Sequence, residues 1–204
     1  SGLKELPLKK LYLSKNMITD FSVLPNLIDL DILCIMENPA EDLSPVGECT
    51  GISRLNIQGM NLNDIDFLKN LKLDYLDMSN AEIKNNIFEP LAEMKKLDTL
   101  CMCDINEAAA ETLSKLSTLK ALFMWGDSTE LENLKPLKGM EELDTLAFTT
   151  QISSLEGIEQ FPSLNFLSVS FSLVKDLSPI TGAENLQTID ISNAEIENYE
   201  PLLE

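Results

Sequence analysis

The side chains that could do acid–base or metal chemistry in this 204-residue chain are carboxylates and thiols, because the sequence contains no histidine. Without histidine, the usual catalytic triads and the commonest general base are absent. No phosphate-binding loop of the GxxxxGK[ST] form occurs. Four aspartates each precede a short turn-like segment, where capping explains them without catalysis: Asp20, Asp42, Asp64 and Asp176. The sequence therefore predicts a non-catalytic segment that is not an enzyme and holds no cofactor or metal.

The charge of the chain limits its partners. Acidic residues outnumber basic residues 34 to 15, which gives a formal charge of -19. Such a chain repels nucleic acid and anionic lipid over its whole surface. No apolar run approaches the roughly 20 residues that span a bilayer, so we expect no direct membrane insertion.

The chain repeats itself. "LDMSNAEIKN" at 76–85 returns as "IDISNAEIEN" at 189–198, and weaker copies fill the interval. The fourth and sixth positions of every copy are apolar, as in Leu100 and Met102. The copies begin at Leu8, Leu30, Ile52, Leu73, Leu97, Leu119, Leu143, Leu164 and Leu186.

With "ITDFSVL" at 18–24, "EDLSPV" at 41–46 and "KDLSPI" at 175–180, this spacing resembles the leucine-rich repeat family. The short repeats are most similar to those of bacterial internalins and phosphatase-regulatory leucine-rich proteins. The resemblance implies an α/β solenoid, a curved right-handed horseshoe with about nine short parallel strands on its concave side and loops or short helical turns on its convex side. One 22-residue unit cannot bury its apolar face alone, so stacked repeats must form the core. We predict one leucine-rich repeat domain over residues 1–204, a fragment of a longer protein.

The repeats depart from the family pattern at two places. Only Asn16 and Asn38 supply the asparagine that the family has at the ninth position. Elsewhere the turn after the strand must satisfy its backbone groups through neighbouring backbone or water. The segment "INEAAAETLSKL" at 105–116 has the alanine content of a true helix on the convex side.

The four cysteines bear on the compartment. In the repeat register, Cys101 and Cys103 lie on the exposed face of one strand, with Cys34 on that face three repeats away and Cys49 at an apolar back position. Three strand spacings are about 14 Å, beyond the roughly 7 Å that a disulfide can bridge. We expect four thiols, which favour a cytoplasmic location, with a bacterial cell surface or secretion as the alternative. A zinc site at Cys101 and Cys103 lacks the remaining ligands, so two small surface residues are the simpler interpretation.

Phe123 and Trp125 are the strongest candidates for a binding site. Alternation in the strand places Leu122 and Met124 toward the core and the two aromatic rings on the open concave face. Exposed aromatic residues often mark protein-binding surfaces. The predicted site adds neighbours on the same face: Tyr75, Cys101, Cys103, Ala147, Thr149 and Phe166. Nearby acids form a rim that favours a basic ligand: Asp77, Asp98, Asp104, Asp144 and Asp190.

Two alternatives stay open. Trp125 could instead be covered by the irregular segment 127–134, or by a domain outside this sequence. A second concave cluster combines Tyr12, Ile32, Cys34 and Met36 beside Lys10 and Lys15, where preceding repeats could equally make contact.

The sequence therefore leaves two classes of function. The first is a module that recognises a protein or peptide on its concave face. The second is a structural or regulatory solenoid attached to an enzyme or anchor outside this segment. Oligomeric state is not encoded in these features.

Overall fold

The computed structural model describes residues 6–85, 87–103, 105–126, 130–149 and 151–203. Nine short strands in these ranges follow one another in chain order in one sheet, which confirms the predicted leucine-rich repeat architecture. Each strand begins at the third position of a predicted repeat: β1 (Lys10–Tyr12), β2 (Ile32–Cys34), β3 (Arg54–Asn56), β5 (Tyr75–Asp77), β7 (Thr99–Met102), β8 (Ala121–Met124), β9 (Thr145–Phe148), β10 (Phe166–Ser168) and β11 (Thr188–Asp190). The chain divides into two compact units, residues 1–100 and 101–204, each described by itself below.

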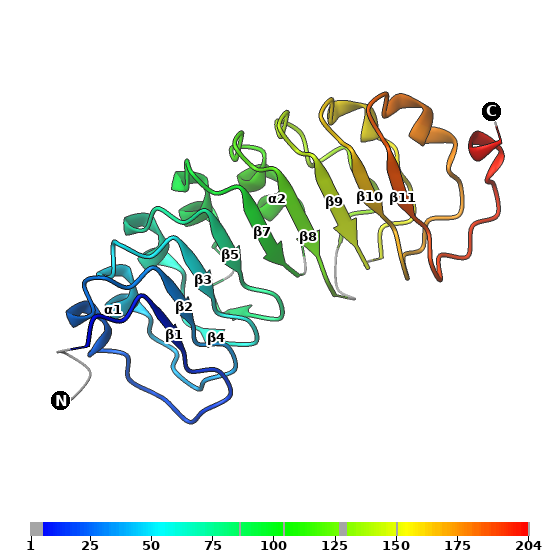
Figure 1. Cartoon of the computed structure of the whole chain (residues 1–204). Helices are drawn as coiled ribbons and strands as arrows, with labels where there is room; N and C mark the ends of the chain where they lie inside the picture. Colours follow the sequence, from blue (N-terminus) through cyan, green and yellow to red (C-terminus); the bar gives the residue numbers. More distant parts are fainter. Residues whose placement is uncertain (1–5, 86, 104, 127–129, 150, 204) are drawn as a thin grey trace. The chain divides into compact units, whose positions relative to one another are not determined.

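In the first unit, β1, β2, β3 and β5 lie side by side as parallel strands (Figure 1). The fourth positions of these repeats are in register, and Leu33, Leu55 and Leu76 are fully buried. The third positions point to the opposite face, because side chains alternate along a strand. We call that opposite side, which carries the third, fifth and seventh positions, the open face.

Short helices line the other side of the first unit. Helix α1 (Ser44–Gly47) packs against the 3-10 turns η2 (Leu24–Asn26) and η3 (Asp66–Asn70), and η3 packs against η4 (Glu89–Glu93). Between strands and helices, β4 (Asn61–Leu62) pairs with β6 (Glu82–Ile83) in a second, two-stranded sheet. Leu24, Val46 and Leu68 are completely buried under this layer, so each helical turn closes the core of its own repeat.

In the second unit, β8, β9, β10 and β11 are parallel neighbours in register (Figure 1). Leu122, Leu146 and Leu167 form the buried ladder. The predicted helix is present as α2 (Glu107–Leu113), which begins where the Asn106 side chain accepts the Ala109 N–H at 2.8 Å. The later turns are η5 (Ile158–Gln160), η6 (Ser178–Gly182) and η7 (Glu200–Leu202). Within the described part of the chain, no helix has the length and apolar composition to cross a bilayer.

A residue with left-handed backbone follows the strand in the repeats whose eighth position is described. Every described eighth position has a positive φ: Lys15, Glu37, Gly59, Asn80, Gly126, Phe171 and Asn193. The Glu37 N–H donates to the Gln58 carbonyl of the next repeat at 2.8 Å. In four of the repeats that lack asparagine at the ninth position, the backbone N–H of that residue donates to the carbonyl of the sixth residue, as from Ala81 to Met78 at 3.0 Å. Neighbouring backbone thus satisfies the turn, as expected.

The aspartates before the helical turns bond the backbone ahead of each turn, but they are not its N-cap: that position belongs to another residue, which makes no side-chain cap bond. Asp20, Asp42, Asp64 and Asp176 each accept the backbone N–H two residues later, at 2.8 to 3.0 Å. Asn85, Asn133, Ser154 and Asn198 make the same bond in other repeats. These side chains fix the entry to each turn, which explains them without catalysis.

Candidate functional site

Phe123 and Trp125 form an aromatic pair on the open face of the second unit. Their rings are stacked, with centroids 5.8 Å apart and an interplanar angle of 22°. Both side chains are half-buried, whereas Leu122 and Met124 between them are completely buried. The predicted alternation is therefore correct, and the rings keep part of their surface accessible.

Small side chains stand in register beside this pair. Phe123 pairs with Ala147 across β8 and β9. The Trp125 N–H donates to the Met102 carbonyl at 3.0 Å, just as the Thr149 N–H donates to the Met124 carbonyl at 3.1 Å. This relation places Cys101 beside Phe123, and Thr149 beside Trp125, as expected from the repeat register.

Two of these neighbours are less accessible than the sequence indicated. Cys101 is only 8% exposed and Ala147 only 2%, although both were expected on the exposed face. A small side chain in register with a large ring presents little surface of its own, which accounts for the difference. Cys103 and Thr149 are half-buried. The accessible surface here therefore comes mainly from the two rings.

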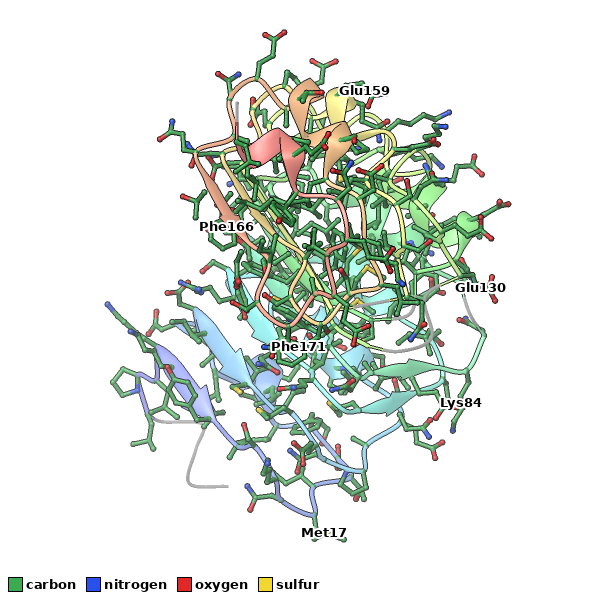
Figure 2. The ribbon with its side chains drawn as sticks, turned by 90° about the vertical axis from the view of Figure 1, so that its right-hand side faces the viewer. Met17, Lys84, Glu130, Glu159, Phe166 and Phe171 are labelled. Carbon is green, nitrogen blue, oxygen red and sulfur yellow. The ribbon has the colours of Figure 1, made fainter. Side chains whose placement is uncertain are left out.

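Phe166 lies at the start of β10 in the same unit and is half-buried (Figure 2). Its register partner is Thr145, so one strand separates it from β8. It extends the apolar part of the open face beyond the stacked pair.

The acidic rim is present in part. Asp144 is exposed and accepts the Thr145 hydroxyl at 3.0 Å. Asp190 at the end of β11 accepts the Ser192 N–H at 2.9 Å, and the Ser192 hydroxyl and N–H lower the pKa of Asp190 to about 2. Asp190 is therefore ionised at neutral pH. Asp104 and residues 127–129, from the segment that could cover Trp125, lie outside the described residues.

The remaining predicted site residues, Tyr75 and Asp77, lie in the first unit. Beside them lies Arg54, which the sequence did not indicate as a site residue. The guanidinium of Arg54 stacks over the Tyr75 ring, 4.8 Å from its centroid. Asp77 accepts the Asn56 amide at 3.0 Å and the Ser79 N–H at 3.0 Å. Arg54 could have been noticed as the only arginine of the chain, at an open third position.

A hollow of about 320 Å³ opens on the same face of the first unit. Leu33 and Leu55, whose side chains belong to the buried core ladder, are among the residues that line it. Around them stand side chains of four neighbouring strands: Tyr12, Ile32, Cys34, Arg54, Asn56 and Tyr75. The second cluster expected from the sequence thus includes a real depression.

All four cysteines are thiols. Cys49 is buried in its back position, as expected, and this burial, helped by the charge of Glu48, raises the pKa of its thiol to about 11. The Cys34 sulfur lies 3.1 Å from the Ser14 hydroxyl. Among the residues that the structure describes, no three histidine, cysteine or carboxylate side chains gather as metal ligands.

No family model matches the chain, but solved structures do. An internalin (InlF) from Listeria monocytogenes is 25% identical over 96% of this chain, with a TM-score of 0.75; this chain spans 58% of that protein. Internalin C2 of the same organism is 23% identical, with a TM-score of 0.72. The match covers 89% of this chain and 79% of internalin C2. The ectodomain of the Arabidopsis receptor kinase HAESA, solved with an IDA peptide hormone ligand, is 22% identical, with a TM-score of 0.65. The match covers 90% of this chain and 34% of the HAESA chain. With its repeat ladder in register along the strands, the chain has a leucine-rich repeat fold that resembles the structures of bacterial internalins.

Proposed function

We propose that the chain is a non-catalytic recognition module that binds a protein or peptide on the open face of its second unit. The observation that carries this proposal is the stacked, half-buried pair of Phe123 and Trp125. Tryptophan is enriched among residues that dominate binding energy, and rings already stacked in the free protein lose little conformational entropy when a partner arrives. The HAESA ectodomain, a structural relative, was solved with a peptide ligand, which supports peptide binding by this kind of scaffold.

The acidic residues at the edge of the open face indicate the charge of the partner. Asp144 and Asp190 flank the open face, and Asp190 keeps its charge far below neutral pH. A partner that covers the rings would meet these carboxylates at its edge, where opposite charge speeds association and suppresses wrong partners. The second unit therefore favours a basic protein or peptide.

The test compares two neighbouring residues of one strand region. Trp125→Ala should lower the free energy of unfolding by no more than about 1 kcal/mol, since its side chain is partly accessible. Met124→Ala is the matched control and should cost about 2 to 5 kcal/mol, because Met124 is completely buried. Trp125 is the only tryptophan, so acrylamide quenching of its fluorescence reports its accessibility directly.

Binding is measured by selecting peptides from a random display library on the immobilised chain. Peptides rich in lysine and arginine should be enriched, and Trp125→Ala should weaken their affinity by roughly thirtyfold or more, as expected for a central tryptophan. A Trp125→Ala variant that loses as much stability as Met124→Ala would instead favour the alternative, a structural solenoid that supports a neighbouring enzyme or anchor.

A further inference from the structure

The guanidinium of Arg54 is an accessible cation on the open face of the first unit. Arg54 is exposed, and within the described ranges no carboxylate lies within ion-pair distance of its guanidinium. Three lysines of the same unit do have such partners: Lys15, Lys69 and Lys84. Although the chain has 34 acidic residues, its sole arginine is therefore free to form an ion pair with a partner.

The surrounding residues hold Arg54 in place without neutralising it. Its guanidinium lies over the ring of Tyr75, its register partner on β5. On one side Asp31 accepts the Ser53 hydroxyl at 2.5 Å, and on the other Asp77 accepts the Asn56 amide at 3.0 Å. Uncharged donors thus engage the flanking carboxylates. A guanidinium that is already oriented loses less freedom when it binds a carboxylate in the bidentate manner.

The neighbouring strands add an apolar surface and a second cation. Ile32 pairs in register with Arg54 and is half-buried, and Tyr12 on β1 is 65% exposed. Lys10 pairs in register with Ile32, is exposed, and has no ion-pair partner among the described residues. Two strand spacings separate Lys10 from Arg54, which is about 10 Å between their α-carbons. The hollow therefore has one cation, Arg54, in an aromatic and aliphatic lining, and a second cation, Lys10, on the neighbouring strand β1.

We propose that this hollow is a second binding site, separate from Phe123 and Trp125, for an extended acidic segment of a partner protein. A glutamate or aspartate of that segment pairs with Arg54, and a large apolar side chain beside it packs against Tyr12 and Ile32. The depression of about 320 Å³ has room for one such side chain. The two units then select segments of opposite charge, an acidic one in the first and a basic one in the second.

The test selects peptides from a random display library, with blocked termini, on the full chain and on Arg54→Gln. Selection on the parent should yield an acidic class, with aspartate or glutamate next to an aromatic or aliphatic residue, and this class should be lost on Arg54→Gln. A synthetic peptide from that class, measured by fluorescence anisotropy, should bind Arg54→Gln about tenfold or more weakly, as expected for a lost charge-assisted hydrogen bond. Raising the salt concentration should also weaken it.

Two controls separate this site from the proposed function. Lys69→Gln removes the same charge from η3, away from the open face, and should leave the affinity within about twofold. Trp125→Ala should also leave the acidic class unchanged, so failure at the second unit does not affect this result. The inference is overturned if no acidic class is enriched, if Arg54→Gln retains that class, or if Lys69→Gln weakens binding as much as Arg54→Gln.

Discussion

The side-chain amide of Asn38 donates to the carbonyl of Leu13, 25 residues earlier in the chain, at 2.9 Å. The same amide also donates to the Ile35 carbonyl of its own repeat at 2.8 Å, and its oxygen accepts the Ile18 N–H at 3.1 Å. Asn38 is only 3% exposed. One buried side chain thus joins the first repeat to the second, through a buried bond to Ile35 and part-buried bonds to Leu13 and Ile18.

Replacement of Asn38 by alanine should therefore be costly. The change leaves the buried Ile35 carbonyl without its donor, at about 1 to 3 kcal/mol for an unsatisfied group, and removes the part-buried bonds to Leu13 and Ile18 as well. We expect a loss of at least 2 kcal/mol in a urea melt. Asn16→Ala is the matched control: Asn16 is exposed and bonds only the Leu13 and Ser14 carbonyls, so water replaces it at little cost. Equal losses in the two variants would contradict this assignment.

The aspartates before the helical turns should be replaceable by asparagine but not by alanine. Asp42 accepts the Ser44 N–H at 2.8 Å and the Ser44 hydroxyl at 3.1 Å. Asp42→Ala removes both acceptors and should lower the unfolding free energy by about 1 kcal/mol, the typical net contribution of a hydrogen bond. Asp42→Asn retains one acceptor oxygen and should recover most of that loss, because asparagine serves this position at Asn85 and Asn133. If both variants melt like the parent, the bond contributes nothing to stability.

The sequence predicted the scaffold better than the accessible surface. Leu100 and Leu122 were placed inward by the repeat ladder, and both are completely buried. The same alternation placed Cys101 and Ala147 on the outer face, yet both are buried, because burial there depends on the size of the side chain on the neighbouring strand. Alternation reports only the direction of a side chain. The contact of Arg54 with Tyr75 was missed for the same reason, since Tyr75 lies 21 positions away in the sequence.

Phe171 occupies a backbone position that suits it poorly. It is the eighth residue of its repeat, with φ of 60°, and its side chain is 66% exposed beyond β10 (Figure 2). Left-handed backbone costs an ordinary residue about 1 to 2 kcal/mol, and asparagine tolerates it better. Phe171→Asn should therefore raise the unfolding free energy by about 0.5 to 1 kcal/mol, measured by thermal melting, because little burial is lost.

The control for Phe171 is Leu173→Asn. Leu173 is 50% exposed and is not among the residues with positive φ, so this change offers no backbone relief. It should leave stability within about 0.5 kcal/mol or lower it slightly. If Phe171→Asn destabilised the protein instead, the exposed ring would have a packing role that outweighs its backbone.

Acid should weaken the second unit through Asp190. The pKa of Asp190 is lowered from 3.8 to about 2, first by the Ser192 hydroxyl and then by the Ser192 N–H. A lowered pKa means that the stabilisation is fully present above pH 4 and is lost as pH falls toward 2. Carbon-13 titration of the carboxyl group should show this low value. Ser192→Ala should move it up toward 3.8, whereas Ser178→Ala should not, since Ser178 bonds Asp176 instead.

Cys49 should be the slowest thiol to react and should affect stability at high pH. Burial raises its pKa from 9.0 to about 11, and the thiolate is the form that alkylates. Mass spectrometry after brief iodoacetamide treatment at pH 8 should therefore find Cys49 modified after Cys34, while the unfolded chain takes up four labels.

Because the folded-state pKa of Cys49 is above the unfolded one, the stabilisation from Cys49 is complete below pH 9 and disappears between pH 9 and 11. The difference in unfolding free energy between the parent and Cys49→Ala should therefore shrink over that interval. Titration of the lysines and tyrosines affects both proteins equally, so it does not contribute to this difference. A constant difference would mean that the Cys49 thiol titrates as it does in water.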